Sequence, residues 1–164
     1  ENNELARLSE FSIPTLKKYF NFLSKTYICE FITPFYTNKR KEIVKNRKVF
    51  FYDTGLRNFI VNDFRPLNLR TDGGAPLENG FWTQITKDEF KARYWRDKNK
   101  NEIDFIIDLG EQKIDAIEIK SNGQKCKPLP MAFSMSYKNA SGFCFCLNGQ
   151  INKKEKIKRF LPLV

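Results

Sequence analysis

Three polar residues on two neighbouring predicted strands have the types and the spacing of a hydrolytic site. Asp104 lies in the apolar segment 102–109, and Glu118 and Lys120 lie in the next apolar segment, 113–120. Alternate side chains of a strand point to the same face, so Glu118 and Lys120 share a face. A tight turn between the two segments would make them an antiparallel hairpin and bring Asp104 close to this face. The sequence therefore predicts an acid–acid–lysine cluster.

Such a cluster suits metal-assisted cleavage of a phosphodiester. Two close carboxylates repel each other, and a hard divalent cation relieves the repulsion; Mg²⁺ is held by one or two carboxylates together with substrate phosphates. We expect Asp104, Glu118 and the backbone carbonyl of Ile119 to bind Mg²⁺ or Mn²⁺. Lys120 would assist the attacking water or stabilise charge on the phosphate. The alternative is an exposed strand pair with a surface ion pair between Asp104 and Lys120.

A third acid, Glu78, lies in a predicted helix that starts at Pro76 and precedes these strands. Proline suits the first turn of a helix, where its missing N–H is not needed. Leu77 and Phe81 lie beside Glu78 on the stripe expected to pack on the sheet. We expect Glu78 to be a third metal ligand or to hold a water. The alternative is an exposed acid favoured by the helix dipole.

Composition narrows the chemistry and indicates an anionic partner. The chain of 164 residues has no histidine, which excludes Ser-His, Cys-His and His-metal sites. The net charge of +10 favours nucleic acid as a partner, although a solvated basic surface would explain it equally well. The candidate phosphate contacts lie in a basic loop and a basic tail: Lys39, Arg40, Lys41, Lys45, Lys153 and Lys154.

Cysteine usage and hydropathy favour a cytoplasmic protein without a membrane partner. The four cysteines form no CxxC pair, so zinc is not expected, and reduced thiols are the simplest interpretation. No apolar run reaches the roughly 18–20 residues that span a bilayer. Because the first residue is Glu1 rather than Met, we expect a fragment of a longer protein. The chain has no P-loop, so we expect no ATPase activity from it alone.

Element patterns predict two domains. The N-terminal part has the pattern of a winged helix. It contains two predicted helices within 4–24, followed by predicted strands at 27–33 and 48–52 that the basic loop joins. The alternative is a helical hairpin with a solvated loop. We place the winged-helix-like domain at 1–47 and the second domain at 48–164.

The second domain is predicted to have an α/β (α+β) fold with a mixed sheet. Its pattern starts with a short helix after Asp53 and the helix from Pro76. The later elements are predicted strands at 92–97, 102–109, 113–120 and 143–147, and a helix at 129–138.

Five motifs occur in the order found in a known family. They are KVFFYDTGL at 48–56, PLEN at 76–79, YWRD at 94–97, NEIDF at 101–105 and AIEIKS at 116–121. Over residues 47–147 the chain resembles the domain of unknown function family 4143, found at the C-terminus of many prokaryotic AAA-type ATPases. The segment 1–47 is similar to the winged-helix region that joins the ATPase to this domain.

The resemblance implies a fold of the PD-(D/E)XK restriction-endonuclease-like type, a mixed sheet flanked by helices. It assigns the helical acid to Glu78, the strand acids to Asp104 and Glu118, and the lysine to Lys120. It also implies an N-terminal AAA ATPase module in the full-length protein. Two main functions stay open: metal-dependent hydrolysis of nucleic acid, with DNA favoured, and an inactive nuclease-like module that binds DNA or docks a partner. A protein-interaction domain with incidental charge is a third.

Overall fold

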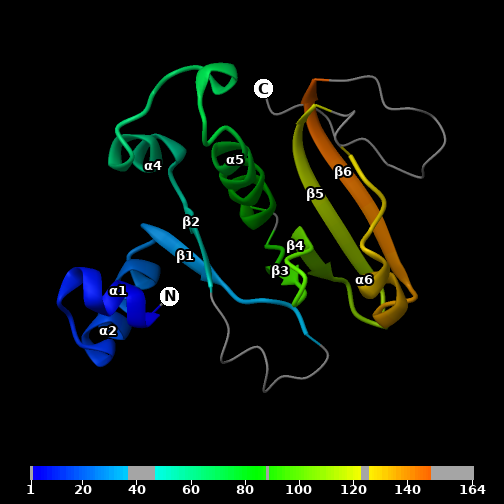
Figure 1. Cartoon of the computed structure of the whole chain (residues 1–164), viewed down its shortest axis with the longest axis horizontal. Coiled ribbons are helices and arrows are strands. Elements are labelled where there is room, and N and C mark those ends of the chain that lie inside the picture. Colours follow the sequence, from blue (N-terminus) through cyan, green and yellow to red (C-terminus); the bar gives the residue numbers. More distant parts are fainter. Residues whose placement is uncertain (1, 37–46, 88, 123–125, 149–164) are drawn as a thin grey trace.

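A computed structural model describes residues 2–36, 47–87, 89–122 and 126–148 of the chain. These ranges form a two-stranded sheet and a four-stranded sheet with helices around them (Figure 1). No helix within them is long and apolar enough to cross a membrane. The basic residues predicted to contact nucleic acid lie outside the described residues: Lys39, Arg40, Lys41, Lys45, Lys153 and Lys154.

The N-terminal helices and strands confirm the elements predicted for this part of the chain. The Ser12 hydroxyl accepts a hydrogen bond from the Thr15 N–H and caps the second helix, whose first turn contains Pro14. The elements are Asn2–Ser9 (α1), Ile13–Lys25 (α2), Cys29–Ile32 (β1) and Lys48–Phe51 (β2). β1 and β2 pair in antiparallel fashion across the position expected to divide the two domains.

The strand β2 is fixed to the following helices by polar and aromatic contacts. The predicted helices after Asp53 and from Pro76 are both present, as Thr54–Ile60 (α4) and Gly74–Lys87 (α5), with a 3₁₀ turn, Leu67–Leu69 (η1), between them. The buried Asn79 amide of α5 accepts from the Phe51 N–H (2.7 Å) and donates to the Phe51 carbonyl (2.8 Å). This amide therefore satisfies both backbone groups of one strand residue.

The four-stranded sheet has the mixed topology of an α/β fold, as predicted. Strands β3, β4 and β5 run antiparallel in sequence order, and β6 lies parallel to β5 after a crossover through α6. Their bounds are Ala92–Arg96 (β3), Glu102–Asp108 (β4), Ile114–Asn122 (β5), Met131–Ser136 (α6) and Ala140–Asn148 (β6).

Hydrophobic cores cover both faces of this sheet. On one face α5 packs with the β2 residue Phe50 against the sheet residues Phe105, Ile107, Ile117 and Ile119. On the other face the α6 residue Phe133 packs against Trp95, Ile103, Ile106, Ile114 and Ala116. The alternation along β5 decides which residues meet α5 and which meet α6. As a result Glu118 and Lys120 continue the α6 face beyond Ala116.

A bulge in β4 lies at Asp104. Arg93 pairs with Ile106 and Trp95 pairs with Ile103, so Asp104 and Phe105 together oppose one residue of β3. Bulges bend a strand and redirect a side chain. Here the last described pair of β4 with β5 is Phe105 with Ile117, and the Asp104 side chain extends toward β5 just beyond that pair.

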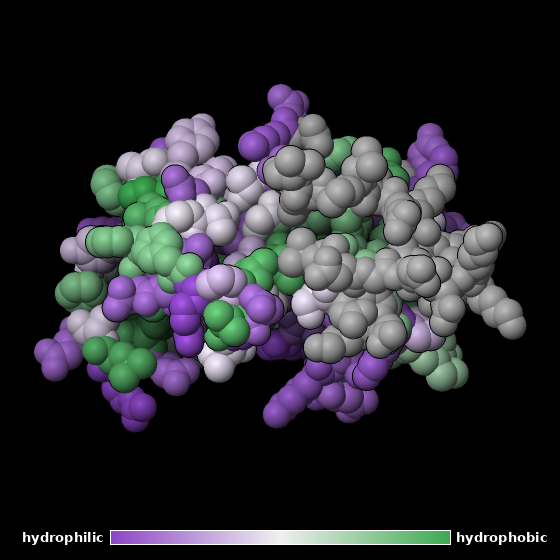
Figure 2. All heavy atoms as spheres, turned by 90° about the horizontal axis from the view of Figure 1, so that it is seen from above, coloured by the Kyte–Doolittle hydropathy of each residue, from purple (hydrophilic) through white to green (hydrophobic). Residues whose placement is uncertain are grey.

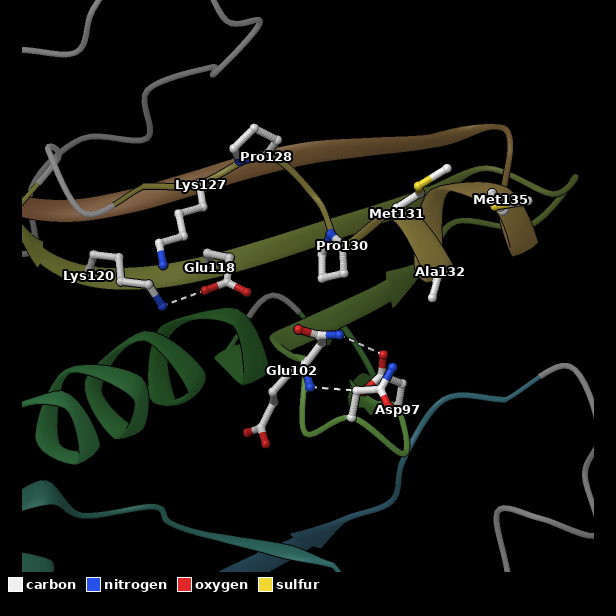
Figure 3. A pocket seen from close by; sticks show the side chains of 12 residues that line it. Asp97, Glu102, Glu118, Lys120, Lys127, Pro128, Pro130, Met131, Ala132 and Met135 are labelled. Carbon is white, nitrogen blue, oxygen red and sulfur yellow. Dashed lines mark hydrogen bonds and ion pairs between the residues drawn. The ribbon is translucent and has the colours of Figure 1, made fainter.

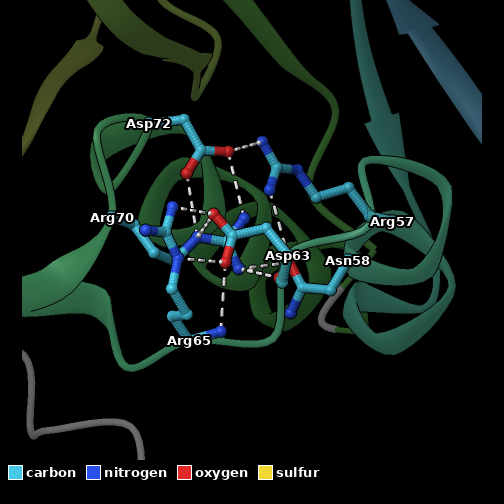
Figure 4. Close-up of polar contacts among 6 residues, drawn as sticks. All are labelled: Arg57, Asn58, Asp63, Arg65, Arg70 and Asp72. Atoms are coloured by element: carbon cyan, nitrogen blue, oxygen red, sulfur yellow. Dashed lines mark hydrogen bonds and ion pairs between the residues drawn. The ribbon is translucent and has the colours of Figure 1, made fainter.

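A polar network joins α4 to the loop before α5 (Figure 4). The Arg70 guanidinium is buried, donates to Asp72 and contacts Asp63, and Arg57 also binds Asp72 at 2.7 Å. Arg65 binds Asp63 through two guanidinium nitrogens, at 3.0 and 2.9 Å. These bonds fix the loop that leads into α5.

Acid should weaken this network in a defined pH window. The hydrogen bonds from Arg65 lower the pKa of Asp63 from 3.8 to about 2, and those from Arg70 lower the pKa of Asp72. A lowered pKa adds stability above the unfolded-state pKa, and this stability is lost as the pH falls through the folded-state pKa. We therefore expect the urea midpoint to fall between about pH 4 and pH 2. Asp63→Asn should have a lower midpoint at pH 7 and a smaller loss across that window; an unchanged slope would contradict the assignment.

The cysteines differ from the prediction of reduced thiols. Cys126 and Cys144 form a disulfide, whereas Cys29 and Cys146 are free. The two cysteines are 18 positions apart in the sequence, so no local pattern predicts that they pair. The parallel crossover from β5 to β6 brings their Cα atoms to 6.0 Å, which is within the usual range for a disulfide.

Candidate functional site

Carboxylates and amino groups from four elements meet at the end of the sheet where β4 starts. The acids come from α5 and from two strands, and one lysine comes from each of β2 and β5. The acids are Glu78, Glu102, Asp104 and Glu118; the lysines are Lys48 and Lys120. We call these six residues the acid–lysine cluster.

The structure brings Asp104, Glu118 and Lys120 together. The Asp104 side chain accepts a hydrogen bond from the Ile119 N–H at 2.8 Å, and the Lys120 Nζ lies 3.4 Å from the same oxygen. Lys120 also forms an ion pair with Glu118. Asp104 is 7% exposed, so the alternative of a surface ion pair does not describe it. The Ile119 carbonyl remains a predicted ligand.

Lys48 and Glu102 complete the cluster, and sequence reasoning missed both. The Lys48 Nζ lies 3.2 Å from Glu78 Oε2 and 4.0 Å from Asp104 Oδ1, and it forms an ion pair with Glu102. The ring of Tyr94 lies 5.5 Å from the same ammonium group. Both missed residues lie in motifs quoted above, KVFFYDTGL and NEIDF. Polar residues at the start of apolar strands were the available signal.

Glu78 is joined to the other acids of the cluster by its ion pair with Lys48. It borders the α5 face that packs on the sheet, as predicted, and its side chain is 25% exposed. It accepts a hydrogen bond from the Lys48 ammonium group, which also contacts Asp104. Glu78 is therefore neither the freely exposed acid of the alternative prediction nor directly bonded to the strand acids.

Burial and charge raise the pKa values of two acids and of both lysines in the cluster. Burial raises the pKa of Glu78 and that of Glu118, although Lys48 and Lys120 partly oppose it. Burial alone would lower the pKa of each lysine, but the neighbouring carboxylates outweigh it and raise both. The cluster thus keeps its lysines charged and favours proton uptake by its most crowded acids.

The cluster has the donor chemistry of a site for a hard divalent cation. Carboxylate oxygens are the ligands that Mg²⁺ and Mn²⁺ prefer, and the acids contain them in sufficient number. In the arrangement described, two ammonium groups bridge the carboxylates. Across the described ranges no three acid, cysteine or histidine side chains converge as a metal site would require. Convergence of three acids therefore requires at least one ammonium group to withdraw.

An open cleft of about 1060 Å³ lies over this cluster (Figure 3). Glu102, Glu118 and Lys120 line part of the cleft, together with the segment that leads into α6 and α6 itself. The segment contributes Lys127, Pro128 and Pro130, and α6 contributes Met131 and Met135. The cleft gives a ligand direct access to Lys120 and Glu118.

Two family models match successive parts of the chain. Residues 74–164 match the model described as Domain of unknown function (DUF4143), which covers more than half of the chain. Residues 1–68 match the model described as Domain of unknown function (DUF8612). Neither a curated protein nor a solved structure matches the chain.

Proposed function

Because the chain belongs to the DUF4143 family, we propose that this domain is a PD-(D/E)XK nuclease-like module that hydrolyses phosphodiester bonds of DNA with Mg²⁺ or Mn²⁺. The observation that carries the proposal is the buried Asp104 joined to Glu118 and Lys120 beneath an open cleft. Removing carboxylates and lysines from water costs free energy even when they are paired, and such clusters with shifted pKa values are frequent at functional sites, which favours a functional role.

Each residue has a defined task in this proposal. Asp104, Glu118 and the Ile119 carbonyl would hold the cation, and Glu78 would support it. When bound, the cation would supply charge stabilisation for the phosphate and a water activated for the attack. Lys120, which already contacts both strand acids, orients that water or stabilises charge on the phosphate. No histidine is needed, in agreement with the composition.

The architecture is also of the kind that the nuclease resemblance implies. A mixed four-stranded sheet carries α5 on one face and α6 on the other, and the candidate acids lie on α5, β4 and β5. Two helices followed by a two-stranded sheet favour a winged-helix segment at the N-terminus. We propose that this segment connects the domain to an AAA ATPase module and that the basic residues bind DNA phosphates.

A cleavage assay tests the proposal. Supercoiled plasmid and linear DNA, incubated with the protein and Mn²⁺, should be cut, and a chelator should stop the reaction. Glu118→Ala should lower the rate by at least about 100-fold, since it removes a proposed ligand and the loss of a group behind a ligand already costs about 10- to 100-fold. Glu111→Ala, at an 87% exposed side chain in the β4–β5 turn, is the matched control and should cleave normally. Cleavage that survives Glu118→Ala would refute the assignment of the site.

A second candidate function is the docking of a partner without catalysis. Large apolar side chains are exposed over α1, α2, α4 and the loop after α4. Hydrophobic residues gather at one end of the face that Figure 2 shows. Exposed apolar patches often mark interaction sites. They include Leu8, Phe22, Phe59, Ile60, Phe64 and Leu69. Salt-dependent DNA binding without cleavage in Mg²⁺ or Mn²⁺ would favour a binding module, and absence of DNA binding at low salt would favour protein docking.

A further inference from the structure

Lys48 lies among the carboxylates to which the proposed function assigns a metal. We propose that its ammonium group is an internal counter-cation that competes with the divalent cation, so that metal binds only when Lys48 withdraws. This inference rests on the proposed function. It adds that Lys48, in the segment before α4, controls whether the metal site is occupied.

The Lys48 ammonium group contacts the carboxylates that a bound metal cation would contact. Its ammonium group reaches Glu78 and Asp104, two proposed metal ligands, together with Glu102. These three acids come from α5 and β4, so Lys48 joins two elements through its ammonium group. The Lys48 side chain is 21% exposed, so water only partly screens these interactions.

Formal charges explain why the two cations exclude each other. The four carboxylates of the cluster meet three cationic side chains, Lys48, Lys120 and Arg96, of which Arg96 binds Glu102 from outside. The site therefore has one net negative charge. A divalent cation added to it would reverse that charge, whereas a divalent cation in place of Lys48 would leave the site neutral. Close like charges in a partly buried site repel strongly.

Lys48 and the acids that it contacts belong to different parts of the chain. Lys48 is the first residue of β2 and lies within the 1–68 match, whereas all four acids lie within the 74–164 match. The Asn79 amide holds the β2 backbone at Phe51, three residues away. Withdrawal therefore requires only rotation of the long, flexible lysine side chain, without loss of this anchor.

Titration of the whole chain with Mn²⁺ alone, followed by calorimetry, tests the inference. Lys48→Met should tighten the Kd for Mn²⁺ by at least about tenfold, a free-energy change of about 1.4 kcal/mol. Lys48→Arg keeps the charge and should give no tightening. Lys91→Met removes an exposed charge next to the opposite end of β3 and is the matched control. It should leave the Kd unchanged.

The outcomes separate this inference from the proposed function. If the native chain and Lys48→Met bind Mn²⁺ with Kd values within twofold, Lys48 does not compete and only this inference fails. If neither chain binds Mn²⁺, both the inference and the proposed metal site fail. Lys48→Gln also removes the positive charge but keeps a polar side chain among the acids, so it should bind Mn²⁺ more tightly as Lys48→Met does, which covers poor folding of the methionine variant.

A measurement on the native chain needs no variant. Acylation of lysine amino groups, followed site by site by mass spectrometry, should increase at Lys48 when Mn²⁺ is added, because the displaced ammonium group becomes accessible. Labelling of Lys91 should stay constant. Unchanged labelling of Lys48 in a chain that binds Mn²⁺ would overturn the inference.

Discussion

Replacing Asp104 with asparagine is expected to lower the rate of Mn²⁺-dependent DNA cleavage by at least about 100-fold. Loss of a group that only hydrogen-bonds to a metal ligand already lowers activity by about 10- to 100-fold, and Asp104 is proposed to be a ligand itself. The asparagine oxygen can still accept the hydrogen bond from the Ile119 N–H, which now reaches Asp104 at 2.8 Å. The fold should therefore persist while the negative charge is lost. Cleavage rates and chemical denaturation of the same preparation measure both effects.

Comparison with alanine separates the two roles of Asp104. Asp104→Ala leaves the buried Ile119 N–H without its acceptor, which should lower the free energy of unfolding by a further 1–3 kcal/mol or so relative to asparagine. Asp108→Asn, at the exposed end of the same strand, is the control and should cleave DNA normally. Equal cleavage by the native chain and Asp104→Asn would show that the charge has no catalytic task.

Replacing Trp82 with alanine should lower the free energy of unfolding by about 3–5 kcal/mol, the usual cost of removing a buried large aromatic side chain. Trp82 is 1% exposed, and its ring lies 5.6 Å from that of Phe50 and 4.9 Å from that of Tyr52. The cavity would open between α5 and the β2 segment. Equilibrium unfolding in urea, monitored by circular dichroism, measures the change.

Two control substitutions define the origin of this effect. Trp82→Phe keeps an aromatic ring in the core and should cost less than alanine. Phe59→Ala, at a residue of α4 that is 70% exposed, should change the free energy of unfolding by no more than about 0.5 kcal/mol. A small effect of Trp82→Ala would mean that the β2 segment is not packed on α5 as described.

Local sequence patterns were sufficient to predict most elements of the fold. The cap at Ser12, the proline at the start of α5 and the alternation along β5 each depend on neighbours only a few residues apart. The proximity of Asp104 to the β5 residues followed from the predicted hairpin, because one short turn joins the two strands. The mixed α/β class follows from this order of elements.

The missed features depend on contacts between distant parts of the chain. Lys48 precedes Glu78 by 30 residues, and only the packing of β2 on α5 brings them together. The bulge at Asp104 appears only when β4 is aligned with β3. The Cys126–Cys144 disulfide likewise needs the parallel crossover from β5 to β6. A single sequence gives no local signal for such long-range pairs.

The Asn79 amide binds both backbone groups of Phe51, and these bonds restrict how the segments of this protein can be exchanged by recombination. A recombination point between the two matched segments would remove β2, leave the amide without these partners and expose the Trp82 face of α5. A new N-terminal segment would have to supply a strand of the same geometry. The two family segments therefore form one physical module across their boundary, and exchanging one without the other should be disfavoured.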